Sequence, residues 1–124
     1  MSRTHSGDAF TIERHGEVQF VCPSSALEHM ESSLVADAAA LMLEPLLRNE
    51  SPQVVIDLSQ LPSFGTPFLA MLIRCWKRIS ERGGTMVIAS VSPDVRQLLK
   101  ITKFDTLWPL YDNRGEAVNA LISD

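Results

Sequence analysis

The chain has 124 residues, which is enough for one ordinary domain and too few for two. Hydrophobic residues make up 45% and charged residues 21% of the chain, which is typical of a globular protein and excludes global disorder. The net charge of -4 argues against a strongly basic nucleic-acid-binding protein, so we expect no direct nucleic-acid partner.

The sequence also argues against a membrane protein, a disulfide-rich protein and a zinc protein. No stretch approaches the roughly 20 consecutive apolar residues that span a bilayer, so we expect no membrane insertion and a cytoplasmic location. The two cysteines, Cys22 and Cys75, lie in apolar stretches and are expected to be reduced thiols of the core. The three histidines lack the spacing of metal ligands. We therefore expect neither a metal nor a cofactor.

In the N-terminal half, apolar residues alternate with other residues over residues 10–12 and 18–22, around a turn expected near His15. Alternation of this kind is typical of a hairpin with one buried face. From Ser33 onward the apolar residues follow spacings of three and four, which predicts an amphipathic helix. Ser33 is its expected N-cap, and Pro45 falls near its end.

The middle of the chain carries the clearest pattern. Residues 54–58 are a nearly continuous apolar run rich in β-branched residues, which predicts a central strand covered on both faces. Thr66 and Pro67 then open a helix, with Thr66 as the expected N-cap and Pro67 at the first helical position, where a missing amide costs nothing. The helix is expected to end at Gly83. Its inward stripe is predicted to consist of Leu69, Leu72, Ile73, Trp76 and Ile79.

Further strand and helix signals follow in the same alternation. Residues 86–89 predict a strand, and Ser92 followed by a proline repeats the pattern of cap and first helical position. Residues 107–111 contain a proline and are therefore expected to form an edge strand. Asn113 and Glu116 form the expected capping box of a final helix.

Two strands followed by repeated strand–helix units predict an α/β fold. We expect a four- to five-stranded mixed sheet packed with about four helices. Residues 1–8 are expected to be a flexible N-terminus, and residues 9–123 a single domain.

Enzyme signatures are absent from the sequence. There is no nucleophile elbow, phosphate-binding loop, dinucleotide-binding fingerprint or zinc-protease motif, which favours a protein that is not an enzyme. Asp57 ends the predicted central strand, where a phosphorylated aspartate of the receiver type would also stand. Such a site needs an acidic pair after the first strand, and residues 13–15 do not supply one. We interpret Asp57 as a turn former whose carboxylate accepts hydrogen bonds from nearby backbone amides.

One long run of elements resembles a known family. Residues 54–84 read as a strand, a turn, a loop, a capped helix and a closing glycine pair, in the sequence VVIDLSQLPSFGTPFLAMLIRCWKRISERGG. Residues 85–121 continue with a strand, a Ser-Pro-led helix, a short strand and an alanine-rich helix, in the sequence TMVIASVSPDVRQLLKITKFDTLWPLYDNRGEAVNAL. This order resembles the STAS domain of the anti-sigma factor antagonist family over about the last seventy residues. The resemblance implies a STAS-like fold.

The family also implies a role for the loop before the second helix. That loop usually reads Asp-Ser-Ser-Gly or Asp-Thr-Thr-Gly, and a partner kinase phosphorylates its first hydroxyl residue. The matching positions here are Gly65, Thr66, Pro67 and Phe68, so the resemblance implies that Thr66 is the phosphoacceptor candidate and that the other three depart from the pattern. Two compatible roles stay open for Thr66. As an N-cap it would stabilise the helix by on the order of 1 kcal/mol, and as a phosphoacceptor it would place the phosphate at the positive end of the helix dipole.

The same helix offers two further candidate features. Phe68 either folds under the sheet edge, which we favour, or projects as an aromatic anchor for a partner. The outward side of the helix is basic and carries Arg74, Lys77, Arg78 and Arg82. Residues 1–65 hold nine acidic and three basic groups and residues 66–124 hold six and eight, so the two segments carry charges of -6 and +2. A solvated helix face explains the basic residues, and a patch that steers an acidic protein partner is the alternative.

The resemblance implies function by reversible protein binding rather than catalysis. The chain is expected to be an anti-sigma factor antagonist-like module that regulates a sigma factor through an anti-sigma factor of the serine-kinase type, with phosphorylation at Thr66 as a switch. The expected partner-binding surface consists of Ser63, Phe64, Gly65, Thr66, Phe68, Arg74 and Arg78. One alternative is a STAS subunit of a larger assembly, such as a stressosome or a lipid-transport complex. Another is a small nucleotide- or ligand-binding domain, because the end of a parallel sheet is a natural ligand crevice.

Overall fold

A computed structural model describes residues 3–6 and 9–122 of the chain, with the backbone alone for residues 3–6. Within this part of the chain, six strands form one sheet: β1 (Arg3–Ser6), β2 (Phe10–His15), β3 (Val18–Pro23), β4 (Gln53–Asp57), β5 (Thr85–Ala89) and β6 (Leu110–Tyr111). The same residues form four α-helices: α1 (Val35–Leu46), α2 (Thr66–Glu81), α3 (Pro93–Ile101) and α4 (Arg114–Ile122). Short 3-10 turns lie at Ser25–Leu27, Ser32–Leu34 and Phe104–Thr106.

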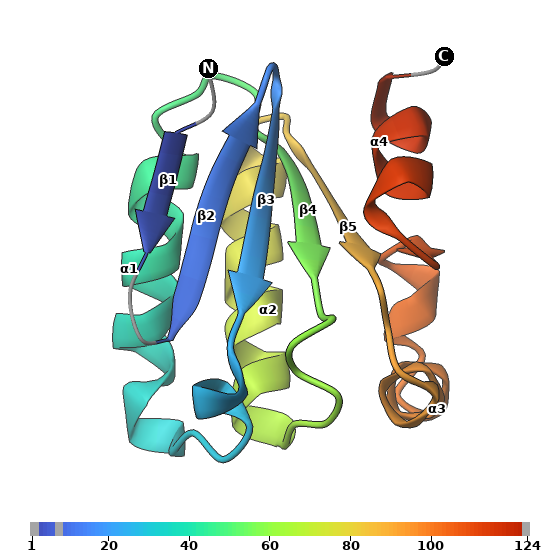
Figure 1. Ribbon diagram of the computed structural model, residues 1–124. Helices are drawn as coiled ribbons and strands as arrows, with labels where there is room; N and C mark the ends of the chain where they lie inside the picture. Colours follow the sequence, from blue (N-terminus) through green and yellow to red (C-terminus); the bar gives the residue numbers. More distant parts are fainter. Residues whose placement is uncertain (1–2, 7–8, 123–124) are drawn as a thin grey trace.

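The strands lie in the sheet in the order of the chain, from β1 to β6, and Figure 1 shows the first five with their labels. The pairs β1–β2 and β2–β3 are antiparallel, and the pairs from β3 to β6 are parallel, so the predicted α/β fold with a mixed sheet is confirmed. The described sheet has one strand more than the four to five expected. The extra strand is Arg3–Ser6, in the segment expected to be flexible, and it pairs with β2 from Arg3 opposite Arg14 to Ser6 opposite Thr11. The expected N-terminus and domain bounds also include residues 1–2, 7–8 and 123, which lie outside the described residues.

Helices pack on both faces of the sheet. On one face, α1 and α2 lie side by side (Figure 1) and form the larger core cluster with residues such as Ile56 of β4. Leu99 of α3 belongs to the same cluster. On the other face, Ala117 of α4 packs in a smaller cluster with Val55 and Val87. Because β4 and β5 are buried on both faces, their sequences are nearly continuous apolar runs, as expected for central parallel strands.

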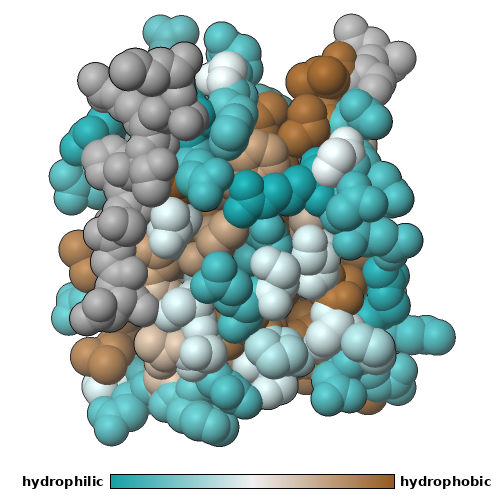
Figure 2. Space-filling model, viewed as in Figure 1, coloured by the Kyte–Doolittle hydropathy of each residue, from teal (hydrophilic) through white to brown (hydrophobic). Residues whose placement is uncertain are grey.

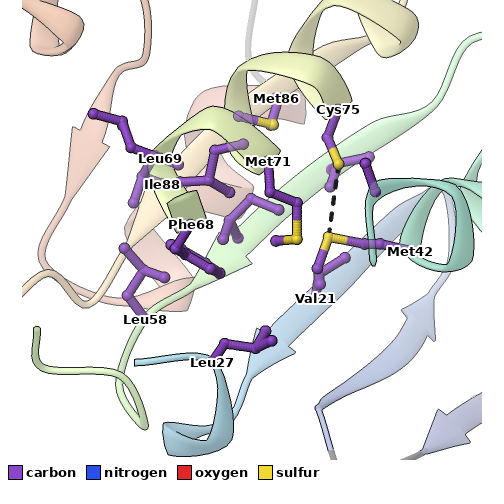
Figure 3. Close-up of a cluster of buried hydrophobic side chains, with 14 of the residues drawn as sticks. Val21, Leu27, Met42, Leu58, Phe68, Leu69, Met71, Cys75, Met86 and Ile88 are labelled. Atoms are coloured by element: carbon purple, nitrogen blue, oxygen red, sulfur yellow. Dashed lines mark hydrogen bonds between the residues drawn. The ribbon is translucent and has the colours of Figure 1, made fainter. Parts of the chain in front are cut away.

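The inward face of α2 is the centre of the larger cluster (Figure 3). Leu69, Leu72 and Ile79 are buried as predicted, whereas Ile73 and Trp76 are half-buried. The buried face also includes Phe68, Met71 and Cys75. The Cys75 Sγ atom lies 3.9 Å from the Met42 Sδ atom of α1 (Figure 3). Burial raises the pKa of the Cys75 thiol to about 12. Both cysteines are free and buried, which confirms their expected place in the core.

Two predicted helix caps are present. The Ser92 hydroxyl accepts a hydrogen bond from the Val95 amide at 3.1 Å, at the start of α3. At the start of α4, the Asn113 side chain accepts a bond from the Glu116 amide at 2.9 Å and donates to the Glu116 carboxylate at 3.4 Å. The reciprocal pair is the capping box that the sequence predicts.

Two other helix starts differ from the prediction. α1 begins at Val35 because a 3-10 turn leads directly into it, and Ser33 does not cap it. α2 begins at Thr66, one residue earlier than expected. The Leu69 amide donates to the Gly65 carbonyl at 3.4 Å, which makes Gly65 the N-cap, and no side chain caps the helix. The predicted N-cap role of Thr66 is therefore wrong.

Candidate functional site

The loop that joins β4 to α2 is held at its start by a side-chain turn and by two buried leucines. The Asp57 carboxylate accepts a hydrogen bond from the Ser59 amide at 2.9 Å, so Asp57 forms the predicted turn. Leu58 and Leu61, at 1% and 0% exposure, anchor the loop in the core. The Leu58 amide also donates to the carbonyl of Ala89 at 3.0 Å, which ties the loop to the end of β5.

The second half of the loop is bound to two distant segments. The Ser63 hydroxyl donates to the Glu28 carboxylate at 2.6 Å, across 35 positions of the sequence. The Ser92 hydroxyl donates to the carbonyl of Pro62 at 2.6 Å, and the same serine caps α3. Because it is fixed from both sides, the loop presents a defined surface rather than a flexible one.

Thr66 stands at the exposed end of this loop, as the first residue of α2. Within the described residues its hydroxyl makes no hydrogen bond, so it is accessible to a partner or an enzyme. Pro67 follows at the second helical position and has no amide to donate. The start of α2 therefore offers one N–H group fewer to an anion than a helix start with two hydroxyl residues does.

Phe64 and Phe68 pack against each other across the start of α2, with ring centroids 4.6 Å apart at 52°. Phe68 is 0% exposed and lies in the core, as the favoured interpretation has it (Figure 3). Its inclusion in the partner-binding surface is wrong, because its side chain points inward from the first turn of α2. Phe64 is 9% exposed and lines a hollow of about 190 Å³ with Ser63 and with Asp94, Val95 and Leu98 of α3.

The basic residues Arg74 and Arg78 lie further along α2. They are exposed and line a groove of about 250 Å³ between α1 and α2. Arg74 comes eight residues after Thr66, which is a rise of about 12 Å along a helix. The predicted surface therefore divides into two neighbouring parts: the helix start with Ser63, Phe64, Gly65 and Thr66, and the groove with Arg74 and Arg78.

The sequence reasoning missed a polar cluster on the other face of the sheet, centred on Arg114 at the start of α4. The Arg114 Nε atom lies 2.5 Å from the Asp57 carboxylate, and its Nη1 atom lies 3.3 Å from that of Glu13. Its Nη2 atom donates to Cys22 Sγ at 2.6 Å, and the guanidinium lies 4.7 Å from the centre of the Phe20 ring. These residues come from β2, β3, β4 and α4, so no local motif reveals them.

The cluster shifts the protonation of its members. Burial opposes ionisation of Asp57, but hydrogen bonds from Arg114 and Ser59 outweigh it and hold the pKa of this carboxyl below its usual value. Burial, together with the charge of Asp57, raises the pKa of the Cys22 thiol. Asp57 is thus ionised and paired, and Cys22 is a protonated thiol at neutral pH.

On the face of the molecule seen in Figure 2, hydrophilic and hydrophobic residues are interspersed. No helix of the described residues is long and apolar enough to cross a membrane.

Comparison with known proteins identifies the family. The sequence model of the STAS domain matches residues 5–117. An anti-sigma F factor antagonist from Paenibacillus polymyxa is 29% identical over 110 residues, which cover 89% of this chain and 92% of the relative. The structure of an anti-sigma-factor antagonist (STAS) domain protein from Planctomyces limnophilus superposes with a TM-score of 0.80 at 29% identity, over 92% of this chain and 98% of that one. An anti-sigma factor antagonist from Mycobacterium paratuberculosis shares the fold, with a TM-score of 0.71 at 22% identity over 96% and 100% of the two chains. The chain therefore belongs to the STAS domain family and is similar to anti-sigma factor antagonists.

Proposed function

We propose that this STAS domain binds an anti-sigma factor of the serine-kinase type and thereby frees a sigma factor, with Thr66 as the phosphoacceptor that switches the complex. The observation that carries the proposal is the exposed Thr66 hydroxyl, which has no partner among the described side chains and stands on a loop fixed by hydrogen bonds. The similarity to anti-sigma factor antagonists supports the same role.

The proposed surface consists of Ser63, Phe64, Gly65 and Thr66, with Arg74 and Arg78 at its rim. A phosphate on Thr66 would add about two negative charges at neutral pH. Acidic groups already stand beside the loop, because Glu28 binds Ser63 and Asp94 lines the hollow next to Phe64. The added charge therefore finds little compensation on this protein, and phosphorylation weakens the complex by repulsion and by the cost of desolvating the phosphate.

A protein partner is better supported than a small-molecule ligand or an enzymatic activity. The two hollows beside the proposed surface measure about 250 and 190 Å³, whereas small-molecule sites typically measure roughly 300–1,000 Å³. A role as a subunit of a larger STAS assembly stays a prediction, and measurement of the oligomeric state in solution would test it.

The test uses purified kinase-type anti-sigma factors from the organism that encodes this chain. With ATP, one of them should phosphorylate the wild-type chain at Thr66, as located by mass spectrometry, and should leave Thr66→Ala unlabelled. Thr66→Glu should weaken the complex by about tenfold or more, as measured by calorimetry.

Ser80→Glu is the matched control, because Ser80 is an exposed residue of the same helix and the substitution adds the same charge. Its affinity should equal that of the wild type. Equal affinities for Thr66→Glu and the wild type would contradict the proposed partner-binding surface. Label on another residue would remove Thr66 as the switch.

A further inference from the structure

The groove between α1 and α2 has one wall that is small and apolar. Ala36 and Ala40 of α1 are exposed at its edge, and Ala39 and Leu43 of the same helix are buried at its floor. Side chains this short leave the backbone of α1 open to close approach by another chain. The wall therefore suits apolar side chains that a partner inserts between the two helices.

The opposite wall is basic. It carries Arg74, Lys77 and Arg78 of α2, together with one acidic residue, Glu81. Among the described residues, none of the three cations lies in an ion pair, whereas Arg48, Arg96 and Arg114 all have carboxylate partners. The chain has a net charge of -4, so three unpaired cations make this wall locally positive on a protein that is negative as a whole. They remain available to carboxylates from outside the molecule.

The outer edge of α1 limits what can bind. Asp37 and Glu44 are exposed and lie three positions before and four positions after Ala40, so they share a face of the helix with it. Glu44 is paired with Arg48 at 3.3 Å, whereas Asp37 lies in no ion pair among the described residues. A broad anionic surface, such as a membrane or nucleic acid, would meet these carboxylates as well as the basic wall. A narrow partner with acidic groups along one side only can place them on α2 and avoid the edge of α1.

We propose that this groove docks an acidic amphipathic helix of a protein partner. Its apolar side chains lie between Ala40 and the floor of the groove, and its carboxylates pair with Arg74 and Arg78, which stand one helical turn, or about 6 Å, apart. The space of about 250 Å³ is smaller than a typical ligand pocket and suits a few side chains of a docked segment. The acidic edge of α1 opposite the basic wall determines which side of the partner helix faces α2.

This inference deepens the proposed function, on which it rests for the view that Arg74 and Arg78 belong to a partner surface. Its test does not require the anti-sigma factor. The probe is a short synthetic helix with a row of leucines and a row of glutamates beside it. A second peptide carries glutamine in place of each glutamate. Binding is followed by amide chemical shifts of the isotope-labelled full chain and by fluorescence anisotropy.

The glutamate peptide should bind saturably and shift the amides of Ala36, Ala40, Arg74 and Arg78, and the glutamine peptide should bind at least about tenfold more weakly. The double variant Arg74→Glu/Arg78→Glu should lose this preference and instead favour a peptide with lysine in place of glutamate. The control is Lys100→Glu/Lys103→Glu, which makes the same change of charge at two exposed cations at the end of α3 that, like Arg74 and Arg78, lie in no ion pair among the described residues; it should bind as the wild type does.

Other results overturn the proposal: equal binding of the glutamate and glutamine peptides, shifts confined to other residues, or tighter binding of anionic phospholipid vesicles or duplex DNA at the same residues. If the double glutamate variant fails to unfold cooperatively, Arg74→Gln/Arg78→Gln replaces it with the same expected loss. A protein that binds the peptide but no anti-sigma factor would contradict the proposed function alone, and the reverse result would contradict the groove alone.

Discussion

Removal of the Arg114 side chain should destabilise the fold, because it leaves the buried Asp57 carboxylate without its cation. The side chain of Asp57 is 6% exposed and that of Arg114 is 33% exposed. Breaking a fully buried ion pair costs about 3–5 kcal/mol. Because Arg114 is partly exposed, water can reach the space that it leaves, and we expect Arg114→Ala to lower the free energy of unfolding by about 2–3 kcal/mol at pH 7.

The loss should depend on pH in a direction that the lowered pKa of Asp57 fixes. Because the folded-state pKa lies below the unfolded value of about 3.9, the paired carboxylate stabilises the fold above that pH. The stabilisation is lost as the pH falls through the folded-state pKa, where Asp57 becomes neutral. The difference between the wild type and Arg114→Ala should therefore be largest near pH 7 and should shrink below pH ~4.

Urea denaturation at several pH values, followed by circular dichroism, measures both effects. Asp57→Asn/Arg114→Ala is the control, because it removes the charge that the single variant leaves unpaired. The double variant should recover part of the lost stability. A loss below about 0.5 kcal/mol at pH 7, or a loss that stays the same from pH 7 to pH 3, would show that the pair does not hold α4 on the sheet.

Four further predictions concern single side chains. Leu72→Ala should lower the free energy of unfolding by about 2–5 kcal/mol and Arg78→Ala by less than about 0.5 kcal/mol, because Leu72 is 0% exposed and Arg78 lies on the surface; similar values in urea titrations would show that the buried stripe is misplaced. Thr66→Ala should change stability by less than about 0.5 kcal/mol, whereas Ser92→Ala should cost about 1–2 kcal/mol, because only Ser92 caps its helix; the opposite order in thermal unfolding contradicts the helix starts described here. Cys75, with its pKa of about 12, should resist alkylation at pH 8 until the chain unfolds. Peptide mapping measures this, and a label found on Cys75 after treatment of the native protein would refute the prediction. Gly84→Ala should be strongly destabilising, since its new Cβ would collide with the carbonyl of Pro52 and with Ile79; a melting temperature equal to that of the wild type would contradict this packing.

Local patterns predicted most of the fold. The alternation of residues 10–12 and 18–22 identified the hairpin of β2 and β3, and the Ser92 and Asn113 caps placed α3 and α4. These signals are local, because a cap or an alternating strand is decided by neighbours within four residues. The predicted start of α2 was wrong by one residue, because Gly65 and Thr66 are both acceptable N-cap residues. In the structure the N-cap is Gly65.

The candidate site was predictable only where its residues are close in sequence. The loop and Thr66 follow from the resemblance, and the basic face of α2 follows from helical spacing. The apolar wall that α1 adds to the groove depends on how two helices pack, and the bond from Ser63 to Glu28 joins positions 35 residues apart. The cluster around Arg114 joins positions up to 101 residues apart, so only the assembled sheet brings its members together.

Arg114 follows all six strands of the described sheet in the sequence, which has a consequence for the order of folding. Each strand of the sheet pairs with the strand that precedes it, so a chain made from its N-terminus can assemble β1 to β5 before residue 114 is available. Until then, Glu13 and Asp57 face the surface that α4 later covers, without their shared cation. We therefore expect the docking of α4 to be the last step of assembly. It should also be the first part of the native protein to open, so that amide protons of α4 exchange faster than those of β4.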